Sequence, residues 1–461
     1  MTAVDRFIAH ALHLKWNDVP THAQDAAKRF YLDTLGVGVA GVKMPLSAPM
    51  LNVAERWGAC GPQTPGARVW GTDRRLPAAS AAYVNAFQIH CQEFDCVHEP
   101  ALVHPLATIG AALSAEAEAR GGISGPDFLT ALTVAVDLAA SLGVAVKSPL
   151  RFFRPATAGV FGATLGIAAM RKFTMEQTRN ALGYALAQAA GTMQAHVEGK
   201  PALPVQIAGA ARAALVANDL AEEGLEAAHD VFEGPYGYLT LFEEDWDLEP
   251  ILDALGQTWR IAEVSYKPYP TGRAAHGGLP LMRSMYERGI RPDDVENIVL
   301  IGPPLIKRLV GRPAYEGMAN NYARLCYAYT GAVMLKTGDV TLSDFDAQAL
   351  NAPDVLELAK RITVIDDGSP DPSAFTPQTL TVTLKSGQTH SLSLDHLYGA
   401  PSDLMTPEAA HRKLIACLNF GLGGTQERLA DTLRDAVFNI ETITDMRMLL
   451  SQLTGKDERH D

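Results

Sequence analysis

Residues that can transfer protons are concentrated in one stretch of the chain, "HCQEFDCVHEPALVHP", at positions 90–105. It contains three histidines and acidic residues that include Glu93 and Asp95. A histidine oriented by a carboxylate is a common general acid or base. We predict that His104, fixed before a proline, acts with Glu93 and Asp95 in proton transfer, and that His98 helps to bind substrate. A polar linker is our second interpretation of this stretch, and a divalent-metal site is the third.

A second stretch, "SYKPYPTGRAAHGG" at positions 265–278, combines two cations and an imidazole with prolines and glycines. Its prolines favour an extended backbone, and a helix is predicted to begin near Arg273. The N-terminus of a helix favours anions, and Lys267 and Arg273 add positive charge. We therefore predict that this stretch holds a carboxylate, with Arg273 binding it and Lys267 or His276 placed for proton transfer.

Three further stretches supply candidate substrate ligands. "SPLRFFRPATAGVFGA" contains Arg154, and a guanidinium can bind a carboxylate through two parallel hydrogen bonds. "NNYARLCYAY" places Tyr322 and Arg324 in an apolar segment, where the arginine needs a partner such as a ligand anion. "MQAHVEGKPALP" adds His196 and Lys200, and we take Lys200 as a candidate ligand. For "SPLRFFRPATAGVFGA" the alternative interpretation is that its two arginines are simply solvated and bind no ligand.

Composition excludes several classes of protein. The 461 residues are 47% hydrophobic and 20% charged, an ordinary globular balance, and the net charge of −13 disfavours nucleic acid as a partner. Five scattered cysteines and the lack of a signal-like N-terminus indicate the cytoplasm. The most apolar window, 128–146, has Asp137 near its centre, so we expect a buried helix and no membrane partner.

The elements that must position these residues fall into two types. Alanine- and glycine-rich segments with helical spacing occupy the chain to about residue 260, and helical spacing returns after about 405. Between them lie β-branched runs, two of which flank Ser386–Gly387 as in a hairpin. We predict a mainly α protein with an α+β second domain: an all-helical bundle from residues 1–262 and 401–461, and an inserted α+β domain, 263–400.

Taken together, several segments resemble the MmgE/PrpD family of 2-methylcitrate dehydratases, cis-aconitate decarboxylases and iminodisuccinate epimerases. They are "YLDTLGVGVAG", "EFDCVHEPALVHP", "VFEGPYGYLTLF", "KPYPTGRAAHGG" and "YGAPSDLMTPEAAHRKL". The resemblance implies a homodimer with its active site in a cleft between a helical and an α+β domain. It also implies chemistry beside a carboxylate without metal or organic cofactor. His104 takes the place of the family's active-site histidine, Glu93 that of a usual aspartate, and Lys267 and His276 carry over.

The chain also departs from the family pattern. Arg154 stands where many members have a histidine, Pro204 where they have a lysine, and Ile207 where they have another histidine. We expect Arg154, Arg273 and Arg324 to replace part of the lost positive charge. The departures indicate a divergent member whose polycarboxylate substrate is neither 2-methylcitrate nor cis-aconitate.

Three functions remain as hypotheses. The first is a cofactor-free lyase, of the hydro-lyase kind, that removes a proton next to a carboxylate of a small di- or tricarboxylate. The second is an isomerase or epimerase that uses the same carbanion and returns the proton to the other face. The third is a carboxylate-binding protein that has lost catalysis, which the missing lysine and histidines would favour.

Overall fold

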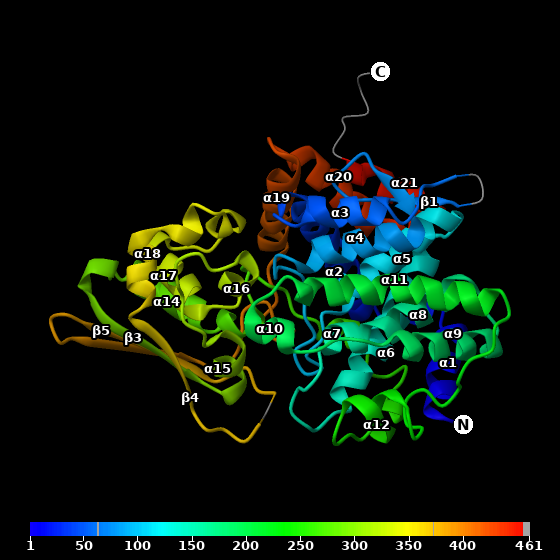
Figure 1. Ribbon diagram of the computed structural model, residues 1–461, viewed down its shortest axis with the longest axis horizontal. Coiled ribbons are helices and arrows are strands. Elements are labelled where there is room, and N and C mark those ends of the chain that lie inside the picture. Colours follow the sequence, from blue (N-terminus) through cyan, green and yellow to red (C-terminus); the bar gives the residue numbers. More distant parts are fainter. Residues whose placement is uncertain (62–63, 372, 455–461) are drawn as a thin grey trace.

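Helices and a small sheet separate into two parts of the molecule (Figure 1). The computed structural model describes residues 1–61, 64–371 and 373–454. In Figure 1 the four-stranded sheet and its helices lie on the left, and helices from both ends of the chain lie in the part on the right. The predicted fold class, mainly α with an α+β part, is confirmed. We keep 263–400 as the proposed extent of the inserted domain.

The helical part is formed by both ends of the chain. Glycines allow its helices to approach closely: a Cβ on Gly421 of α19 would lie 2.3 Å from the carbonyl oxygen of Val39 in α2. A side chain is therefore excluded where the two ends of the chain meet. The helices are α1 (Ala3–His13), α2 (Thr21–Ala40), α3 (Ser47–Glu55), α4 (Ala78–His90), α5 (Pro105–Arg120), α6 (Gly125–Val144), α7 (Arg154–Thr157), α8 (Gly159–Met170), α9 (Met175–Gln188), α10 (Gln194–Glu198), α11 (Ala202–Glu222), α12 (Tyr238–Phe242), α13 (Glu249–Asp253), α19 (Pro407–Leu422), α20 (Glu427–Phe438) and α21 (Arg447–Leu450).

Helix α6 is long and apolar enough to cross a membrane, yet 89% of its apolar window is buried inside the fold. Its Asp137 is buried, as the sequence predicted for a core helix. The carboxylate accepts hydrogen bonds from Nε2 of His10 at 3.1 Å and from the N–H of Arg260 at 2.9 Å. These partners offset the cost of burying a charge in the helical core.

The α+β part is built on a four-stranded sheet with the order β4-β3-β5-β6. Strands β3 and β4 are parallel, and the other pairs are antiparallel. Ile298, Leu300, Leu380 and Val382 are buried on it, and α14 and α17 belong to the same apolar core. The elements are β3 (Val295–Gly302), β4 (Ile362–Asp366), β5 (Gln378–Leu384), β6 (Thr389–Leu394), α14 (Gly278–Glu287), α15 (Pro304–Val310), α16 (Asn320–Arg324), α17 (Tyr327–Thr337) and α18 (Pro353–Ala359).

Two details of strand structure follow from local sequence. The predicted hairpin joins β5 and β6, with Gly387 at φ +87°, a conformation that suits glycine. A second sheet of two short strands, β1 (Gly66–Arg68) and β2 (Arg75–Pro77), lies in the helical part. Three-residue strands carry little periodicity, so this sheet cannot be predicted from the sequence pattern.

Backbone pairing joins the two stretches that carried the candidate chemistry. Val97 and Ser265 exchange N–H···O bonds of 3.0 and 2.7 Å, and the N–H of Tyr266 donates to the carbonyl of Gly399 at 2.8 Å. The chain therefore crosses between its two parts beside the loop that joins α4 to α5. This crossing fixes where the side chains of both stretches meet.

Candidate active site

Asp95 joins two histidines in the loop between α4 and α5. Its Oδ2 accepts a hydrogen bond from Nδ1 of His90 at 3.0 Å and another from Nδ1 of His104 at 3.0 Å. His90 is the last residue of α4, and His104 is the N-cap of α5, so two helix ends set the positions of the rings. The rings meet edge to face with centroids 4.8 Å apart. His90 was not among the predicted site residues, although it begins the stretch that contained them.

Lys267 reaches this cluster from the second stretch. Its Nζ donates to Oε2 of Glu93 at 2.8 Å and lies 3.8 Å from Oδ1 of Asp95. All three side chains are buried. The structure thus brings Glu93, Asp95, His104 and Lys267, four of the predicted catalytic residues, into one connected group. Oppositely charged partners make this concentration of buried charge tolerable.

The loop that carries the cluster has an unusual backbone. Glu93 and Leu102 have φ values of +50° and +53°, in the left-handed region that non-glycine residues rarely adopt. His98 stabilises the loop, because its Nδ1 accepts from the N–H of Ala101 at 3.2 Å and its Nε2 lies 2.9 Å from Oε2 of Glu263. Strained residues of this kind gather at functional sites. In this position His98 supports the loop.

The pKa values in the cluster are shifted in different directions. Burial opposes ionisation of Asp95, but the charges of His104, His90 and Lys267 hold its pKa well below the usual range. Burial also acts on Glu93, and Lys267 with the two histidines lowers its pKa to about 2. Burial disfavours a charged His90, yet Asp95 and Glu93 raise its pKa. His104 differs, because burial and Lys267 lower its pKa in spite of Asp95.

These shifts set the charges of the two carboxylates in the cluster. Glu93 and Asp95 are anionic, and they favour a proton on the neighbouring His90. His104 stays neutral at neutral pH, and its place at the N-terminus of α5 further disfavours an imidazolium. Because its Nδ1–H is directed to Asp95, its Nε2 is the basic atom. A neutral imidazole oriented by a buried carboxylate can act as a general base.

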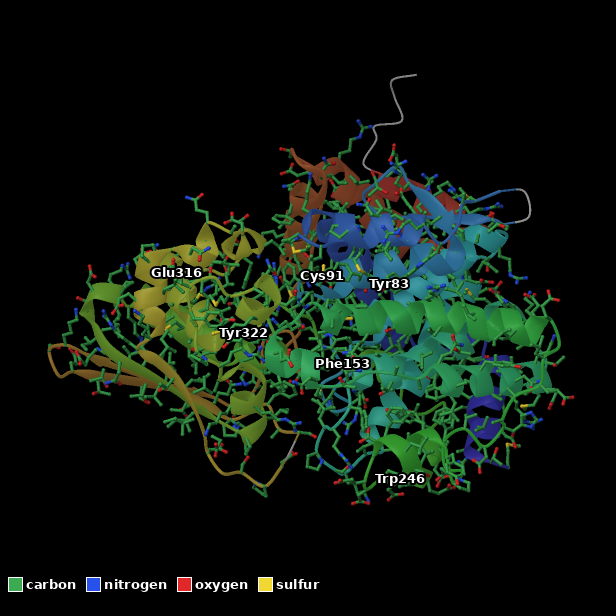
Figure 2. All side chains as sticks on the ribbon, in the orientation of Figure 1. Tyr83, Cys91, Phe153, Trp246, Glu316 and Tyr322 are labelled. Atoms are coloured by element: carbon green, nitrogen blue, oxygen red, sulfur yellow. The ribbon has the colours of Figure 1, made fainter. Side chains whose placement is uncertain are left out.

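His104 faces a cavity of about 80 Å³ between the two parts of the molecule. The side chain of His104 is 14% exposed, whereas Asp95 and Lys267 are fully buried. Glu93, His196 and Arg273 also line the cavity. Most of the remaining wall is apolar and includes Val97, Leu102, Phe153, Met193, Leu203 and Leu325. Figure 2 labels Phe153 near the junction of the two parts.

Arg273 lines this cavity, and one nitrogen of its guanidinium has no partner in the described chain. Its Nε donates to Oε1 of Glu99 at 2.8 Å, and its Nη1 donates to the carbonyl of Tyr398 at 2.8 Å. Nη2 is buried, and no partner for it lies among the residues that the structure describes. A carboxylate in the cavity could accept a charge-assisted bond from this nitrogen.

The other two predicted arginines have partners within the protein. Arg154 makes two bonds to the carboxylate of Glu243, at 2.8 and 3.1 Å. Arg324 donates to the carbonyls of Gln92 and Pro270, both at 2.9 Å, and lies 4.0 Å from the ring centroid of Phe345. Neither is among the described residues that line the cavity. Arg154 is thus paired with a carboxylate, and the N–H groups of Arg324 are taken up by neutral acceptors of the protein.

Three more predicted residues lie away from the cavity wall. Nε2 of buried His276 donates to the carbonyl of Thr271 at 3.2 Å, a bond within the second stretch. The Tyr322 hydroxyl donates to the carbonyl of Pro313 at 2.7 Å. Lys200 is exposed. The described lining residues do not include these three side chains.

The donor atoms of His90, Asp95 and His104 lie within 4.8 Å of one another, which is close enough for a metal site. The bonding pattern does not suit one. Oδ2 of Asp95 already accepts from both imidazoles through Nδ1, the atoms that would have to bind the ion. The Lys267 ammonium, 3.8 Å from Oδ1, would repel a second cation. The geometry favours a hydrogen-bonded proton-transfer group.

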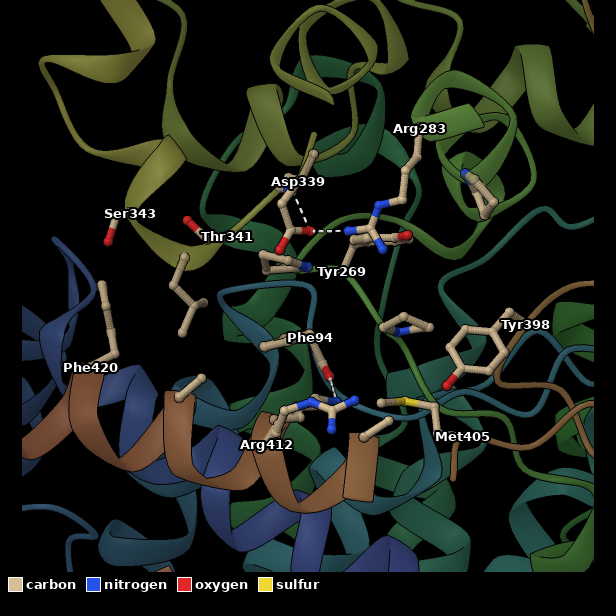
Figure 3. A pocket seen from close by; sticks show the side chains of 18 of the residues that line it. Phe94, Tyr269, Arg283, Asp339, Thr341, Ser343, Tyr398, Met405, Arg412 and Phe420 are labelled. Atoms are coloured by element: carbon tan, nitrogen blue, oxygen red, sulfur yellow. Dashed lines mark hydrogen bonds and ion pairs between the residues drawn. The ribbon is translucent and has the colours of Figure 1, made fainter. Parts of the chain in front are cut away.

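A larger cleft of about 930 Å³ lies on the other side of the same loop, between α19 and the α+β part. Figure 3 shows Arg283 paired with Asp339 on one side of it and Arg412 and Phe420 on the other. Phe94 lines this cleft, and its carbonyl accepts from Nζ of Lys413 at 2.9 Å. The catalytic candidates Glu93 and His104 line the smaller cavity. We therefore take the smaller cavity as the candidate active site.

Comparison with known proteins gives matches along nearly the whole chain. The model of the MmgE/PrpD N-terminal domain matches residues 5–251, and that of the MmgE/PrpD C-terminal domain matches 269–436. The cis-aconitate decarboxylase-like protein oryM of Aspergillus oryzae is 27% identical, covering 96% of this chain and 95% of the relative. Cis-aconitate decarboxylases of Mus musculus and Homo sapiens are each 26% identical, covering 97% and 99% of this chain and 92% and 95% of the relatives.

Proposed function

The chain belongs to the MmgE/PrpD family, and from this membership and the cavity we propose that it is a cofactor-free lyase, of the hydro-lyase kind. It removes a proton next to a carboxylate of a small di- or tricarboxylate. One observation carries the proposal: His104, oriented by Asp95, lines a cavity that is also lined by Arg273, whose Nη2 has no partner among the described residues. The base and the carboxylate ligand of such a reaction thus share one space.

In the proposed reaction a substrate carboxylate accepts a hydrogen bond from Nη2 of Arg273. Nε2 of His104 takes the proton from the adjacent carbon, and the electron pair of the C–H bond moves toward the carboxylate to give an enediolate. The protonated His104, held by Asp95, then passes this proton to the leaving hydroxyl. The C–O bond breaks, a C=C bond forms and water departs. Fixed donors around the enediolate lower the barrier because its charge develops only in the transition state.

The cavity wall narrows the substrate class. Each additional carboxylate brings a charge that must be paired or left in an apolar environment at high cost. Arg273 has one free nitrogen, and most of the remaining wall is apolar. Within the proposed class, dicarboxylates with an apolar substituent therefore suit the site better than tricarboxylates.

A panel of di- and tricarboxylates incubated in D2O tests the function. Deuterium incorporation and ultraviolet absorbance are followed together, since elimination creates a conjugated double bond. We expect exchange with new absorbance for at least one acid. Exchange without new absorbance would indicate an epimerase, and neither exchange nor new absorbance across the panel would indicate a binding protein.

A further inference from the structure

A second histidine lines the same cavity as His104. His196 belongs to the short helix α10 and is buried, with 7% of its surface exposed. In Figure 1, α10 lies at the junction of the two parts, next to α16. Its role depends on which of its nitrogens carries a proton.

Arg312 of the α+β part determines which ring nitrogen of His196 carries the proton. Its Nη2 donates to the carbonyl of His196 at 2.9 Å and lies 3.5 Å from the ring Nδ1. A guanidinium can only donate, so Nδ1 accepts and the proton of the neutral ring is on Nε2. Within the described chain, the hydrogen bonds that Arg312 makes to His196 go to Nδ1 and to the carbonyl, and no hydrogen bond involves Nε2. This N–H is therefore available to a ligand in the cavity.

Arg312 is itself held in place. Its guanidinium carbon lies 4.9 Å from the ring centroid of Tyr322, which Figure 2 labels at the junction. Helix α10 ends at Gly199, whose φ is +64° and whose added Cβ would lie 2.7 Å from Tyr322. Helix, tyrosine and arginine therefore pack directly on one another. Tyr322, a predicted substrate ligand, supports Arg312 in this arrangement.

The surrounding charges keep His196 neutral. Burial, and after it the charge of Arg312, lowers the pKa of His196 to about 4. Arg308 acts in the same direction, and Glu93 opposes it. At neutral pH the ring thus presents a neutral N–H. A neutral imidazole can polarise a developing oxyanion without bringing a second cation close to Arg312.

The site has few other donors for a developing charge. The family resemblance leads one to expect a lysine and a histidine near the start of α11, where this chain has buried Pro204 and Ile207. Arg154 and Arg324 donate their hydrogen bonds to acceptors within the protein. Of the described side chains that line the cavity, Arg273 has a buried Nη2 without a partner, and His196 makes no hydrogen bond to protein through Nε2.

We propose that His196 is a further catalytic residue, whose Nε2–H donates a hydrogen bond to the carboxylate oxygen that gains charge when His104 takes the adjacent proton. Arg312 is a positioning residue, because it fixes the tautomer of His196. This inference deepens the proposed function and rests on it. The two donors of the oxyanion, Arg273 and His196, come from the two different parts of the molecule, so their docking completes the site.

Binding of a nitronate, an analogue of the enediolate, tests the role of His196 without requiring the reaction to occur. The nitronate of 3-nitropropionate carries its charge on two oxygens of a planar group, as an enediolate does, whereas succinate has the same length without that group. We expect His196→Leu to weaken nitronate binding, and to lower kcat for exchange, by about 10²–10³-fold. Succinate binding should change by less than about threefold. His196→Gln, which keeps an N–H near the position of Nε2, should retain both within about tenfold of the wild type.

The outcomes of this experiment distinguish failure of the proposed role of His196 from failure of the proposed lyase function. If exchange occurs and His196→Leu, folded by circular dichroism, keeps wild-type kcat and nitronate affinity, the inference is wrong and the proposed lyase stands. If nitronate binding depends on His196 but no acid exchanges, the inference stands and the lyase fails. If the nitronate binds neither protein and no acid exchanges, both are wrong.

Arg312→Met tests the positioning role by a spectroscopic readout. Without the guanidinium, the pKa of His196 should rise from about 4 toward its ordinary value. Nitrogen NMR of the labelled imidazole measures both that midpoint and the tautomer. An unchanged midpoint with the proton still on Nε2 would show that Arg312 does not control the ring.

Discussion

The cavity lined by His104 and the larger cleft lined by Phe94 lie on two sides of the loop between α4 and α5, and they differ in size and in charge. The cavity of about 80 Å³ is bordered by Glu93 and His104, and the cleft of about 930 Å³ by Phe94, the residue next to Glu93. In the cavity wall the charged groups are buried and have shifted pKa values. In the cleft Arg283 pairs with Asp339 at 2.7 Å near the surface. Buried and perturbed titratable groups mark a candidate active site better than volume does.

The largest difference in exchange rate between a substitution in the cavity and one in the cleft should follow removal of the proposed base, His104. We expect His104→Ala to lower the rate of deuterium exchange by about 10²–10⁴-fold, because general base catalysis contributes on that scale. Arg412→Gln, a matched change in the cleft, should leave the rate unaltered. Exchange is measured by NMR and folding by circular dichroism. A folded, active His104→Ala protein would remove His104 from the site.

Lys267→Met should show the cost of unbalanced charge in the cavity wall. The change leaves Glu93 and Asp95 without their ammonium partner, and breaking a buried ion pair costs about 3–5 kcal/mol of stability. Urea unfolding measures this loss. Lys307→Met, which breaks an exposed pair with Asp366, is the control and should cost less than about 1 kcal/mol.

A second substitution sharpens this test. Adding Glu93→Gln to Lys267→Met removes one of the uncompensated carboxylates and should restore part of the lost stability. A loss below about 1 kcal/mol for Lys267→Met alone would mean that the cluster does not depend on the lysine.

Arg273→Lys should act on substrate binding. A lysine cannot keep the bonds to Glu99 and Tyr398 and also present a third donor, because it lacks the planar fork of a guanidinium. We expect KM to rise about 10–100-fold, the equivalent of one charged hydrogen bond. Arg154→Lys is the control, since Arg154 is equally buried but bonds to Glu243, and it should leave KM unchanged. The reverse result would exchange the roles of the two arginines.

The pH dependence of kcat/KM should report the state of His104. Burial and Lys267 lower its pKa, and the base must be unprotonated. Activity is therefore constant above that pKa and falls about tenfold per pH unit below it, with a midpoint under the ordinary value of about 6.5. Lys267→Met should move the midpoint upward if it folds. A wild-type midpoint above about 6.5 would contradict the neutral imidazole.

Interactions in this site can be predicted from the sequence when the two residues are close together along the chain. His104 and Asp95 are nine residues apart, and a dense polar stretch was enough to propose their interaction. Helical spacing and alanine content likewise indicated the helical part, since such patterns are local. The approach of Lys267 to Glu93 was suggested only by the family resemblance, because 174 residues separate the two.

The arginines show where sequence is insufficient. Arg154 bonds to Glu243, which is 89 residues away in the sequence, and Arg324 donates to the carbonyl of Gln92, which is 232 residues away. Whether a guanidinium faces a ligand or a protein acceptor is decided by this long-range packing, and its own neighbours in sequence do not reveal it. The same holds for His196, whose tautomer depends on Arg312, 116 residues away.

The smallest effect is expected in the cleft. Arg283→Ala removes a pair with Asp339 whose side chains are 37% and 56% exposed, and solvent screens such pairs strongly. Its unfolding free energy should change by about 0–1 kcal/mol in urea. The exchange rate should stay at the wild-type value, since Arg283 contacts neither His104 nor Arg273 within the described chain. A tenfold loss of exchange would show that the cleft takes part in the reaction, and volume would then be as good a guide as buried charge.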